Sequence, residues 1–200
     1  MSKQSNVKTL TPDECQELLN YLGRDPRAPS GSRQRLRNKC AVIFLLNTGL
    51  RVSEFCQLRI SDLVFQGRSV RSLTVRAEIA KNGREREIPL NLRAGEAVDS
   101  MNRFLWIREH RAPDLYAWQL ADTSKPASPR LFQTILKKAG FDCLGKRVTP
   151  HMLRHTFATR AIKKTDSRVV QKLLGHANLQ TTQVYTHPDS DDLQRAVDSI

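Results

Sequence analysis

Aromatic residues and long apolar runs are scarce in this chain. Aromatic residues make up 6% of its 200 positions, so the composition does not favour a surface on which splayed-out bases stack. No segment reaches the roughly 20 consecutive apolar residues that a membrane-spanning helix needs. Residues 1–10 also lack the apolar core of a secretory signal. These absences argue against a membrane-bound or secreted protein.

Metal-binding side chains are sparse as well. The chain has four cysteines, Cys15, Cys40, Cys56 and Cys143. They form no Cys-x-x-Cys pair, which predicts free and mostly buried thiols in a reducing cytoplasm. His151 and His155 have the i, i+4 spacing of some zinc ligands, but no Glu lies between them and no third ligand is evident. Because the acidic residues are scattered, a two-metal nuclease centre is not indicated either. We expect no metal and no cofactor.

Basic residues outnumber acidic ones by 33 to 20, for a formal net charge of +13. The excess is concentrated in residues 24–39 and 137–172, whereas residues 189–200 are acidic. Two basic stretches favour contact with the phosphates of duplex DNA, although each stretch alone is equally compatible with an ordinary solvated surface. The candidate DNA-backbone contacts are Arg33, Arg35, Arg37, Lys39, Arg84 and Arg147.

Hydrophobic periodicity predicts a mainly α-helical domain with a small antiparallel β-hairpin. Thr11-Pro12-Asp13-Glu14 is a capping box at the start of the first helix, and Gly49 and Gly175 are expected to end helices. The expected helices cover residues 12–22, 36–47, 52–58, 94–110, 129–139, 151–164, 167–174 and 178–185, with a loop at 112–128. The Asn-Gly pair in Lys81-Asn82-Gly83-Arg84 predicts a tight turn between strands 72–79 and 85–90.

We expect three segments: a flexible lead at residues 1–10, one domain at 11–187 and a tail helix at 188–200. In the tail, Leu193, Ala196, Val197 and Ile200 fall on one helical face. This face could dock on the chain's own core or on a neighbouring copy, and the sequence favours neither.

The helix expected from His151 combines side chains that are suited to binding phosphate. His151 and Arg154 lie about 60° apart around a helix, so they share a face near its N-terminus. Leu153 and Phe157 point away from that face and can anchor the helix in the core. A helix N-terminus that also carries a His and an Arg is a candidate phosphate site. An ordinary surface helix with a solvated Arg is the alternative.

Five segments extend this pattern across residues 11–187. They are NTGLRVSE (47–54), KNGREREIPL (81–90), TPHMLRHTFAT (149–159), VQKLLGH (170–176) and TTQVYTH (181–187). In order and spacing they resemble the motifs of the tyrosine recombinases of the phage integrase family. The resemblance implies the catalytic-domain fold of that family and a site-specific recombinase that cleaves and rejoins DNA.

The resemblance also implies a catalytic set, namely Arg51, Lys81, His151, Arg154, His176 and Tyr185. In this reading Tyr185 attacks the phosphorus and forms a 3′-phosphotyrosyl link, which stores the energy of the broken bond. The two arginines hold the non-bridging oxygens, and the two histidines donate further hydrogen bonds. Lys81 protonates the departing 5′ oxygen. Glu54, one turn after Arg51, orients that arginine.

Each of these residues also has an ordinary reading. Arg51 and Glu54 can be a simple helix pair at i, i+3, and Lys81 a solvated turn residue. His176 can cap a helix end, and Tyr185 can be a half-buried aromatic residue.

The short stretch before the first expected helix resembles family members that consist of the catalytic domain alone, without the N-terminal core-binding domain. The resemblance implies double-stranded DNA and a homotetramer on two DNA sites as partners, with an accessory recombinase or DNA-bending protein as a further candidate. It also implies a cytoplasmic, nucleoid-associated protein from a bacterium or a mobile element. Two other functions remain open: relaxation of supercoils, as by a type IB topoisomerase, and a catalytically silent DNA-binding accessory factor.

Overall fold

The computed structural model describes residues 9–24, 32–120 and 125–175. His176, Tyr185, the helix expected at 178–185 and the tail at 188–200 lie outside this part of the chain. In the described part, no helix combines the length and the apolar character that crossing a membrane requires.

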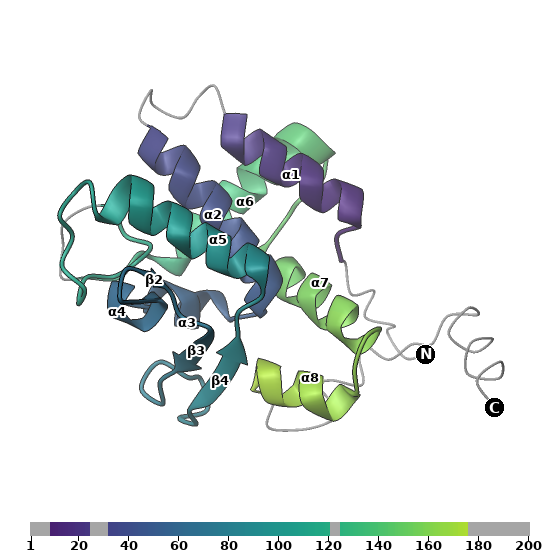
Figure 1. Ribbon diagram of the computed structural model, residues 1–200. Coiled ribbons are helices and arrows are strands. Elements are labelled where there is room, and N and C mark those ends of the chain that lie inside the picture. The colour runs from purple at the N-terminus through teal and green to yellow at the C-terminus, as the bar shows by residue number, and fades with distance from the viewer. Residues whose placement is uncertain (1–8, 25–31, 121–124, 176–200) are drawn as a thin grey trace.

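The described residues are mostly helical and form two small β-hairpins (Figure 1). The N-terminal elements are α1 (Pro12–Arg24), α2 (Ser32–Thr48), α3 (Val52–Cys56) and α4 (Ile60–Leu63). The hairpins are β1 (Val64–Phe65) with β2 (Arg68–Ser69), and β3 (Ser72–Val75) with β4 (Arg86–Pro89). The C-terminal elements are α5 (Leu92–Met101), the π-helix η1 (Asn102–Trp106), α6 (Pro129–Leu144), α7 (Pro150–Ile162) and α8 (Ser167–Leu174). The expected fold class is confirmed.

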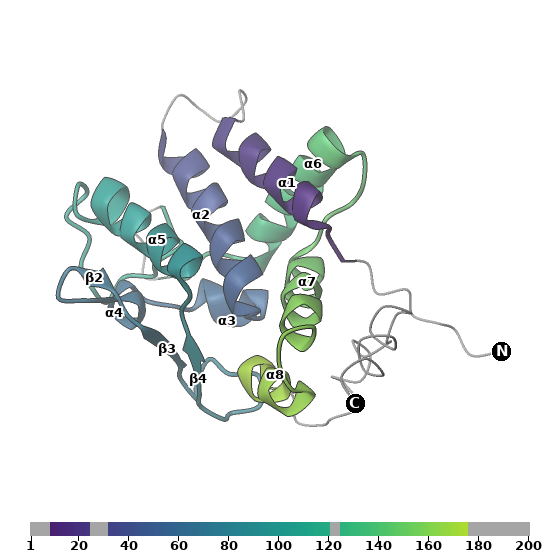
Figure 2. The same cartoon turned by 45° about the vertical axis from the view of Figure 1, so that its right-hand side comes forward.

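Helix α2 is the centre of the packing. It contacts α1, α5 and α7, and its apolar run from Cys40 to Leu46 is buried almost throughout. Both ribbon views place α5 on one side of α2 and α1 with α6 on the other (Figures 1 and 2). The β3–β4 hairpin and α8 lie side by side at the lower edge of both views, where β4 contacts α8.

An aromatic cluster supports the short helix α3. Phe55 stacks on Trp118 with 4.5 Å between ring centroids and meets Phe132 of α6 edge-on at 5.1 Å. Phe44 of α2 contacts both Phe55 and Trp118. All four rings are fully buried, so the start of α3, which Arg51 immediately precedes, rests on a rigid base.

Several predicted helix caps and glycine stops are confirmed. Thr11 and Glu14 exchange backbone and side-chain hydrogen bonds of 3.0 and 3.2 Å at the start of α1. Thr149 caps α7 and Asp166 caps α8, each accepting a backbone N–H with its side chain. The glycines that end α2 and α8 have φ of +63° and +64°, the left-handed region that glycine enters most easily.

The β3–β4 hairpin differs from the prediction. Its ladder runs only from the pair Ser72–Pro89 to the pair Val75–Arg86, so a ten-residue loop at 76–85 replaces the expected tight turn. Ile79 and Ala80 are buried in this loop. Because the chain turns inward to bury them, it cannot continue as a strand to residue 79.

Several other helix boundaries differ from the prediction. Helix α2 begins earlier than predicted, and α6 continues past Ala139 to Leu144. Gly140 lies inside α6, where a Cβ would meet Val148 at 2.5 Å, so glycine lets the segment after α6 pack closely against the helix. The predicted helix 94–110 is an α-helix only to Met101 and continues as η1. The β1–β2 hairpin was not predicted, although Gln66 and Gly67 both adopt positive φ, as its tight turn requires.

Candidate active site

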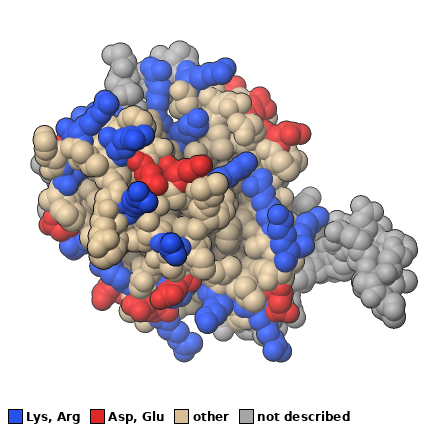
Figure 3. Space-filling view, viewed as in Figure 1, with Lys and Arg blue, Asp and Glu red and all other residues tan. Residues whose placement is uncertain are grey.

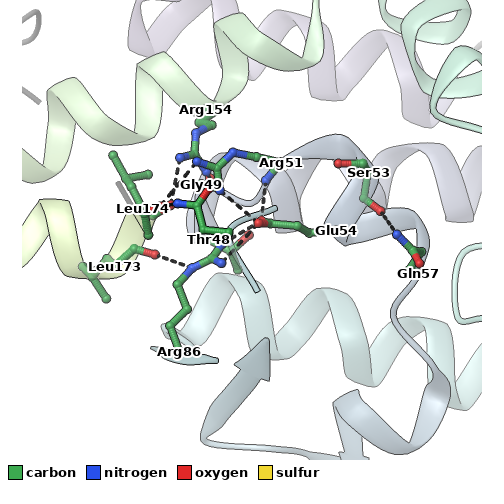
Figure 4. Close-up of polar contacts among 12 residues, drawn as sticks. Thr48, Gly49, Arg51, Ser53, Glu54, Gln57, Arg86, Arg154, Leu173 and Leu174 are labelled. Carbon is green, nitrogen blue, oxygen red and sulfur yellow. Dashed lines mark hydrogen bonds and ion pairs between the residues drawn. The ribbon is translucent and has the colours of Figure 1, made fainter. Parts of the chain in front are cut away.

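Arg51 and Arg154 come from distant parts of the sequence and meet at the end of α8. Arg154 is 5% exposed, and it donates from Nη1 to the Gly49 carbonyl at 2.6 Å and from Nη2 to the Leu174 carbonyl at 2.9 Å. Arg51 immediately precedes α3 and donates from Nη2 to the Gly175 carbonyl at 3.4 Å. Figure 4 shows the Arg51 and Arg154 side chains pointing into one cluster of polar contacts. Carbonyl contacts of this kind fix a guanidinium group in position without neutralising its charge.

Glu54 supplies the negative charge of this cluster. Its fully buried carboxylate accepts from Arg51 Nη1 at 3.0 Å and from the Arg51 backbone N–H at 3.1 Å. Arg86 binds the same carboxylate with both Nη atoms, at 3.2 and 2.6 Å. Burial raises the pKa of Glu54, but the hydrogen bond and charge of Arg86, followed by those of Arg51, outweigh burial and leave the pKa below its usual range. The expected contact between Glu54 and Arg51 is therefore present.

Sequence reasoning did not single out Arg86, whose side chain is only 8% exposed. Besides binding Glu54, its Nε donates to the Leu173 carbonyl at 3.1 Å. A signal was available: in the β4 sequence Arg86-Glu87-Ile88, alternation places Arg86 on the same face as the buried Ile88. An inward-facing arginine requires a buried partner.

The C-terminal end of α8 collects all three arginines. The last carbonyls of a helix have no partner within the helix. Here the backbone carbonyls of Leu173, Leu174 and Gly175 accept hydrogen bonds from Arg86, Arg154 and Arg51, respectively. Gly175 also lets Arg86 pass close by, because a Cβ at this position would lie 3.0 Å from the Arg86 Cδ. His176, which follows directly in the sequence, is outside the described residues.

His151 stands at the start of α7, one turn before Arg154, and its side chain is exposed. Its Nε2 contacts Nε2 of His155 at 2.5 Å, with the two rings nearly perpendicular. Burial and the charge of Arg154 lower the pKa of His151. Burial, together with the charges of His151 and Arg154, lowers the pKa of His155 to about 4. The pair therefore stays neutral at pH values where an isolated histidine would be protonated.

Lys81 lies in the ten-residue loop and is exposed. The neighbouring Asn82 donates from Nδ2 to the Gly175 carbonyl at 3.2 Å. The loop therefore reaches the same helix end as Arg51, and it does so through Asn82.

A groove of about 480 Å³ opens beside His151, between α6 and the start of α7. We call it the α6–α7 groove; it is lined by Val52, Arg130, Gln133, Thr134, Lys137, Arg147, Thr149, Pro150 and His151. Three of these residues are basic and none is acidic. Arg147 was an expected DNA contact, whereas Arg130 and Lys137 were not singled out.

The expected DNA contacts on α2 differ in exposure and in their partners. Arg37 is 5% exposed and its guanidinium lies 5.7 Å from the centre of the Phe132 ring, so it is a core residue and the prediction that it contacts DNA was wrong. Burial lowers the pKa of Arg37 to about 10. Arg33 forms an ion pair with Glu109, while Arg35 and Lys39 are half-buried. Arg84 is exposed in the loop that carries Lys81.

Basic side chains are spread over the face shown in Figure 3, with acidic side chains between them. In the described residues, no three His, Cys, Asp or Glu side chains gather closely enough to hold a metal ion.

The model of the phage integrase family matches residues 8–191, nearly the whole chain. The chain belongs to the phage integrase family. This match confirms the resemblance seen in the sequence motifs.

Two curated relatives are similar over almost the entire chain. Tyrosine recombinase XerA of Pyrococcus furiosus is 35% identical over 192 residues, covering 96% of this chain and 61% of the relative. Tyrosine recombinase XerC of Proteus mirabilis is 35% identical over 195 residues, covering 96% of this chain and 58% of the relative. The chain thus spans about three fifths of the length of these relatives.

Solved structures agree in fold. The crystal structure of XerA recombinase superimposes with a TM-score of 0.70 at 28% identity, covering 96% of this chain and 64% of that one. XerH recombinase in a post-cleavage complex with its palindromic difH substrate gives a TM-score of 0.72 at 25% identity, covering 96% of this chain and 52% of that one.

Proposed function

We propose that this chain carries the catalytic site of a site-specific DNA recombinase, which cleaves and rejoins duplex DNA through a 3′-phosphotyrosyl intermediate. The observation that supports this most strongly is the meeting of Arg51 and Arg154 at the end of α8, braced by Glu54. The relatives named tyrosine recombinase, and the XerH structure with its DNA substrate, support the same activity.

The two guanidinium groups are suited to a scissile phosphate. During the displacement, negative charge grows on the non-bridging oxygens, and prearranged cations lower the energy of that state. Arginine presents planar N–H donors that match phosphate oxygens. Because the carbonyls of Gly49 and Leu174 and the carboxylate of Glu54 already hold these side chains, little reorganisation is needed on binding.

In the cleavage step, Tyr185 Oη forms a bond to phosphorus as the bond from phosphorus to the 5′ oxygen breaks. The tyrosine proton passes to His151, whose lowered pKa keeps it neutral and able to accept. Lys81 gives a proton to the departing 5′ oxygen, and His176 donates a hydrogen bond to the phosphate. The phosphotyrosyl bond preserves the energy of the phosphodiester, so the reverse attack by a 5′ hydroxyl rejoins the strand without ATP.

The α6–α7 groove is the surface we assign to the DNA backbone beside the scissile phosphate. Arg130, Lys137 and Arg147 line it, and His151 lies at its edge. Contacts from such side chains to phosphates position a duplex and carry no sequence information by themselves.

The assembly belongs to the same proposal. We infer a homotetramer that joins two DNA sites in the cytoplasm, with an accessory recombinase or a DNA-bending protein as a further partner. The apolar face of residues 193–200 would then dock either on its own domain or on a neighbouring copy.

The test is a covalent adduct with DNA. Wild-type protein incubated with supercoiled plasmid and then treated with detergent should retain DNA covalently, without added metal. Tyr185→Phe should abolish this adduct while DNA binding in a gel-shift assay stays unchanged. Tyr116→Phe is the matched control and should leave the adduct intact.

Three outcomes decide between this function and its alternatives. An adduct formed by Tyr185→Phe would refute the assignment of the nucleophile. Relaxation of any supercoiled plasmid without a product that joins two sites would favour a topoisomerase. DNA binding by wild-type protein without any adduct on its own site would favour an accessory factor.

A further inference from the structure

We propose that Asn82 and Arg86 are positioning residues that fasten the loop at 76–85, here called the Lys81 loop, to the C-terminal end of α8. Through this attachment they determine where Lys81 presents its ammonium group. The inference deepens the proposed function and rests on it, because it concerns the proton that Lys81 gives to the leaving 5′ oxygen.

Arg86 holds the C-terminal end of the loop. It forms the last pair of the β3–β4 ladder, opposite Val75, so the loop ends at this residue. Its Nε donates to the Leu173 carbonyl at 3.1 Å, and its two Nη atoms bind Glu54 at 3.2 and 2.6 Å. One buried side chain therefore joins the hairpin to α8 and to α3, and a planar guanidinium group is what allows all three contacts.

Asn82 holds the loop next to Lys81 itself. Its Nδ2 donates to the Gly175 carbonyl at 3.2 Å, and the same oxygen accepts from Arg51 Nη2 at 3.4 Å. On the other side of Lys81, Ile79 and Ala80 are 8% and 9% exposed. The backbone of Lys81 is thus held on both sides, although its side chain is exposed.

This arrangement has a consequence for catalysis. A general acid must lie within hydrogen-bonding reach of the atom that it protonates. Because the Gly175 carbonyl contacts both Asn82 and Arg51, the loop and the phosphate-binding arginine share one reference point. If that attachment is lost, Lys81 no longer stands at a defined distance from a phosphate held by Arg51.

The experiment uses two versions of the duplex site at which wild-type protein forms its adduct. One carries the natural 5′ bridging oxygen, and the other carries sulfur in its place. A thiolate leaves without being protonated because a thiol is far more acidic than an alcohol. Slow cleavage that arises from a misplaced general acid should therefore disappear with the sulfur substrate, whereas slow cleavage that arises from damaged phosphate binding should persist.

On the oxygen substrate, Asn82→Ala and Arg86→Lys should form the adduct about 10- to 100-fold more slowly than wild type, as a displaced reacting group does. On the sulfur substrate Asn82→Ala should approach the wild-type rate, as should Lys81→Ala. Arg86→Lys should recover only in part, because Arg86 also binds Glu54, which holds Arg51. Glu85→Ala changes an exposed residue of the same loop and is the matched control, with wild-type rates on both substrates. DNA affinity should be the same for all variants.

The outcomes are separable. The inference would be overturned if the Asn82→Ala variant cleaved the oxygen substrate at the wild-type rate. It would also be overturned if this variant stayed slow on the sulfur substrate. Asn82 is exposed, so its variant keeps the test valid even if Arg86→Lys lowers the melting temperature. Wild-type protein that forms no adduct with either substrate would instead refute the proposed function.

Discussion

At the scale of single residues, neighbours decide what a buried arginine can do. Arg37 and Arg154 are equally inaccessible, each 5% exposed. The guanidinium of Arg37 lies over the Phe132 ring and donates to Asn38. Arg154 donates to carbonyls of α8 and of the turn before α3. One arginine is therefore part of the core, and the other is part of the candidate site.

The histidine pair leads to a prediction about stability and pH. His155 has a folded-state pKa of about 4, below the value of about 6.5 expected in the unfolded chain. Between these values the unfolded chain binds the proton first, so stability is full above about pH 6.5 and falls as the pH drops towards 4. His151 acts in the same direction, since its pKa is also lowered.

Replacing His155 with Gln should therefore weaken the loss of stability on acidification. Because His155 is partly exposed, we expect the difference between pH 7.5 and pH 5 to shrink by on the order of 1 kcal/mol. Urea denaturation at both pH values measures this. An unchanged difference in the variant would contradict the assigned pKa. The lowered pKa of Glu54 affects the stability of the fold only at more acidic pH, where its carboxylate becomes protonated.

At the scale of elements, the junction where α2 ends is the tightest point next to the site. Gly49 adopts φ +63°, and a Cβ there would lie 2.3 Å from Cδ1 of Phe157 in α7. The Gly49 carbonyl also accepts from Arg154. The end of one helix, the packing of another and the position of an arginine of the candidate site thus depend on a single residue without a side chain.

Gly49→Ala should destabilise the protein by about 3 kcal/mol or more, because it adds a steric clash to the cost of a left-handed backbone. Gly145→Ala is the matched control, since Gly145 ends α6 at the same φ of +63° and a Cβ there would have no neighbour within 4 Å. The control should lose only about 1–2 kcal/mol. Thermal or urea unfolding measures both, and equal losses would show that the contact with Phe157 has no effect.

At the scale of the whole molecule, the net charge of +13 does not form a continuous basic surface on the face shown in Figure 3. Acidic side chains interrupt the basic ones on the face shown in Figure 3. The α6–α7 groove, by contrast, is lined by Arg130, Lys137 and Arg147 and by no acidic residue. We therefore expect phosphate contacts to concentrate there.

Replacing these three residues together with Gln should weaken DNA binding and reduce its dependence on salt. Each phosphate contact contributes about 0.9 to the slope of log affinity against log salt, so the slope should fall by about 2 to 3. Arg108→Gln, an exposed residue outside the groove, is the control and should retain the wild-type slope. Titrations at several salt concentrations measure both, and an unchanged slope in the triple variant would place the DNA elsewhere.

Neighbours within a few residues determine caps, glycine stops and helical periodicity, and these were predicted well. The start of α1, the cap of α7 and the stop at Gly175 all followed from such local rules. The motifs likewise predict Arg51, Glu54 and Arg154 as site residues, and the structure brings these side chains to the end of α8 and the start of α3. His176 and Tyr185 stay predictions, since they lie outside the described residues.

Contacts between distant segments were beyond these rules. Because Ile79 and Ala80 are buried, the Lys81 loop takes the place of the expected tight hairpin. Because Arg37 is buried, it is not among the candidate DNA contacts. Arg86 and Asn82 contact the carbonyls at the end of α8 only because this end packs against β4 and the loop. Local sequence encodes helix caps and glycine stops such as Gly175, whereas the partners of a helix's last carbonyls depend on which segments the packed core brings to that end.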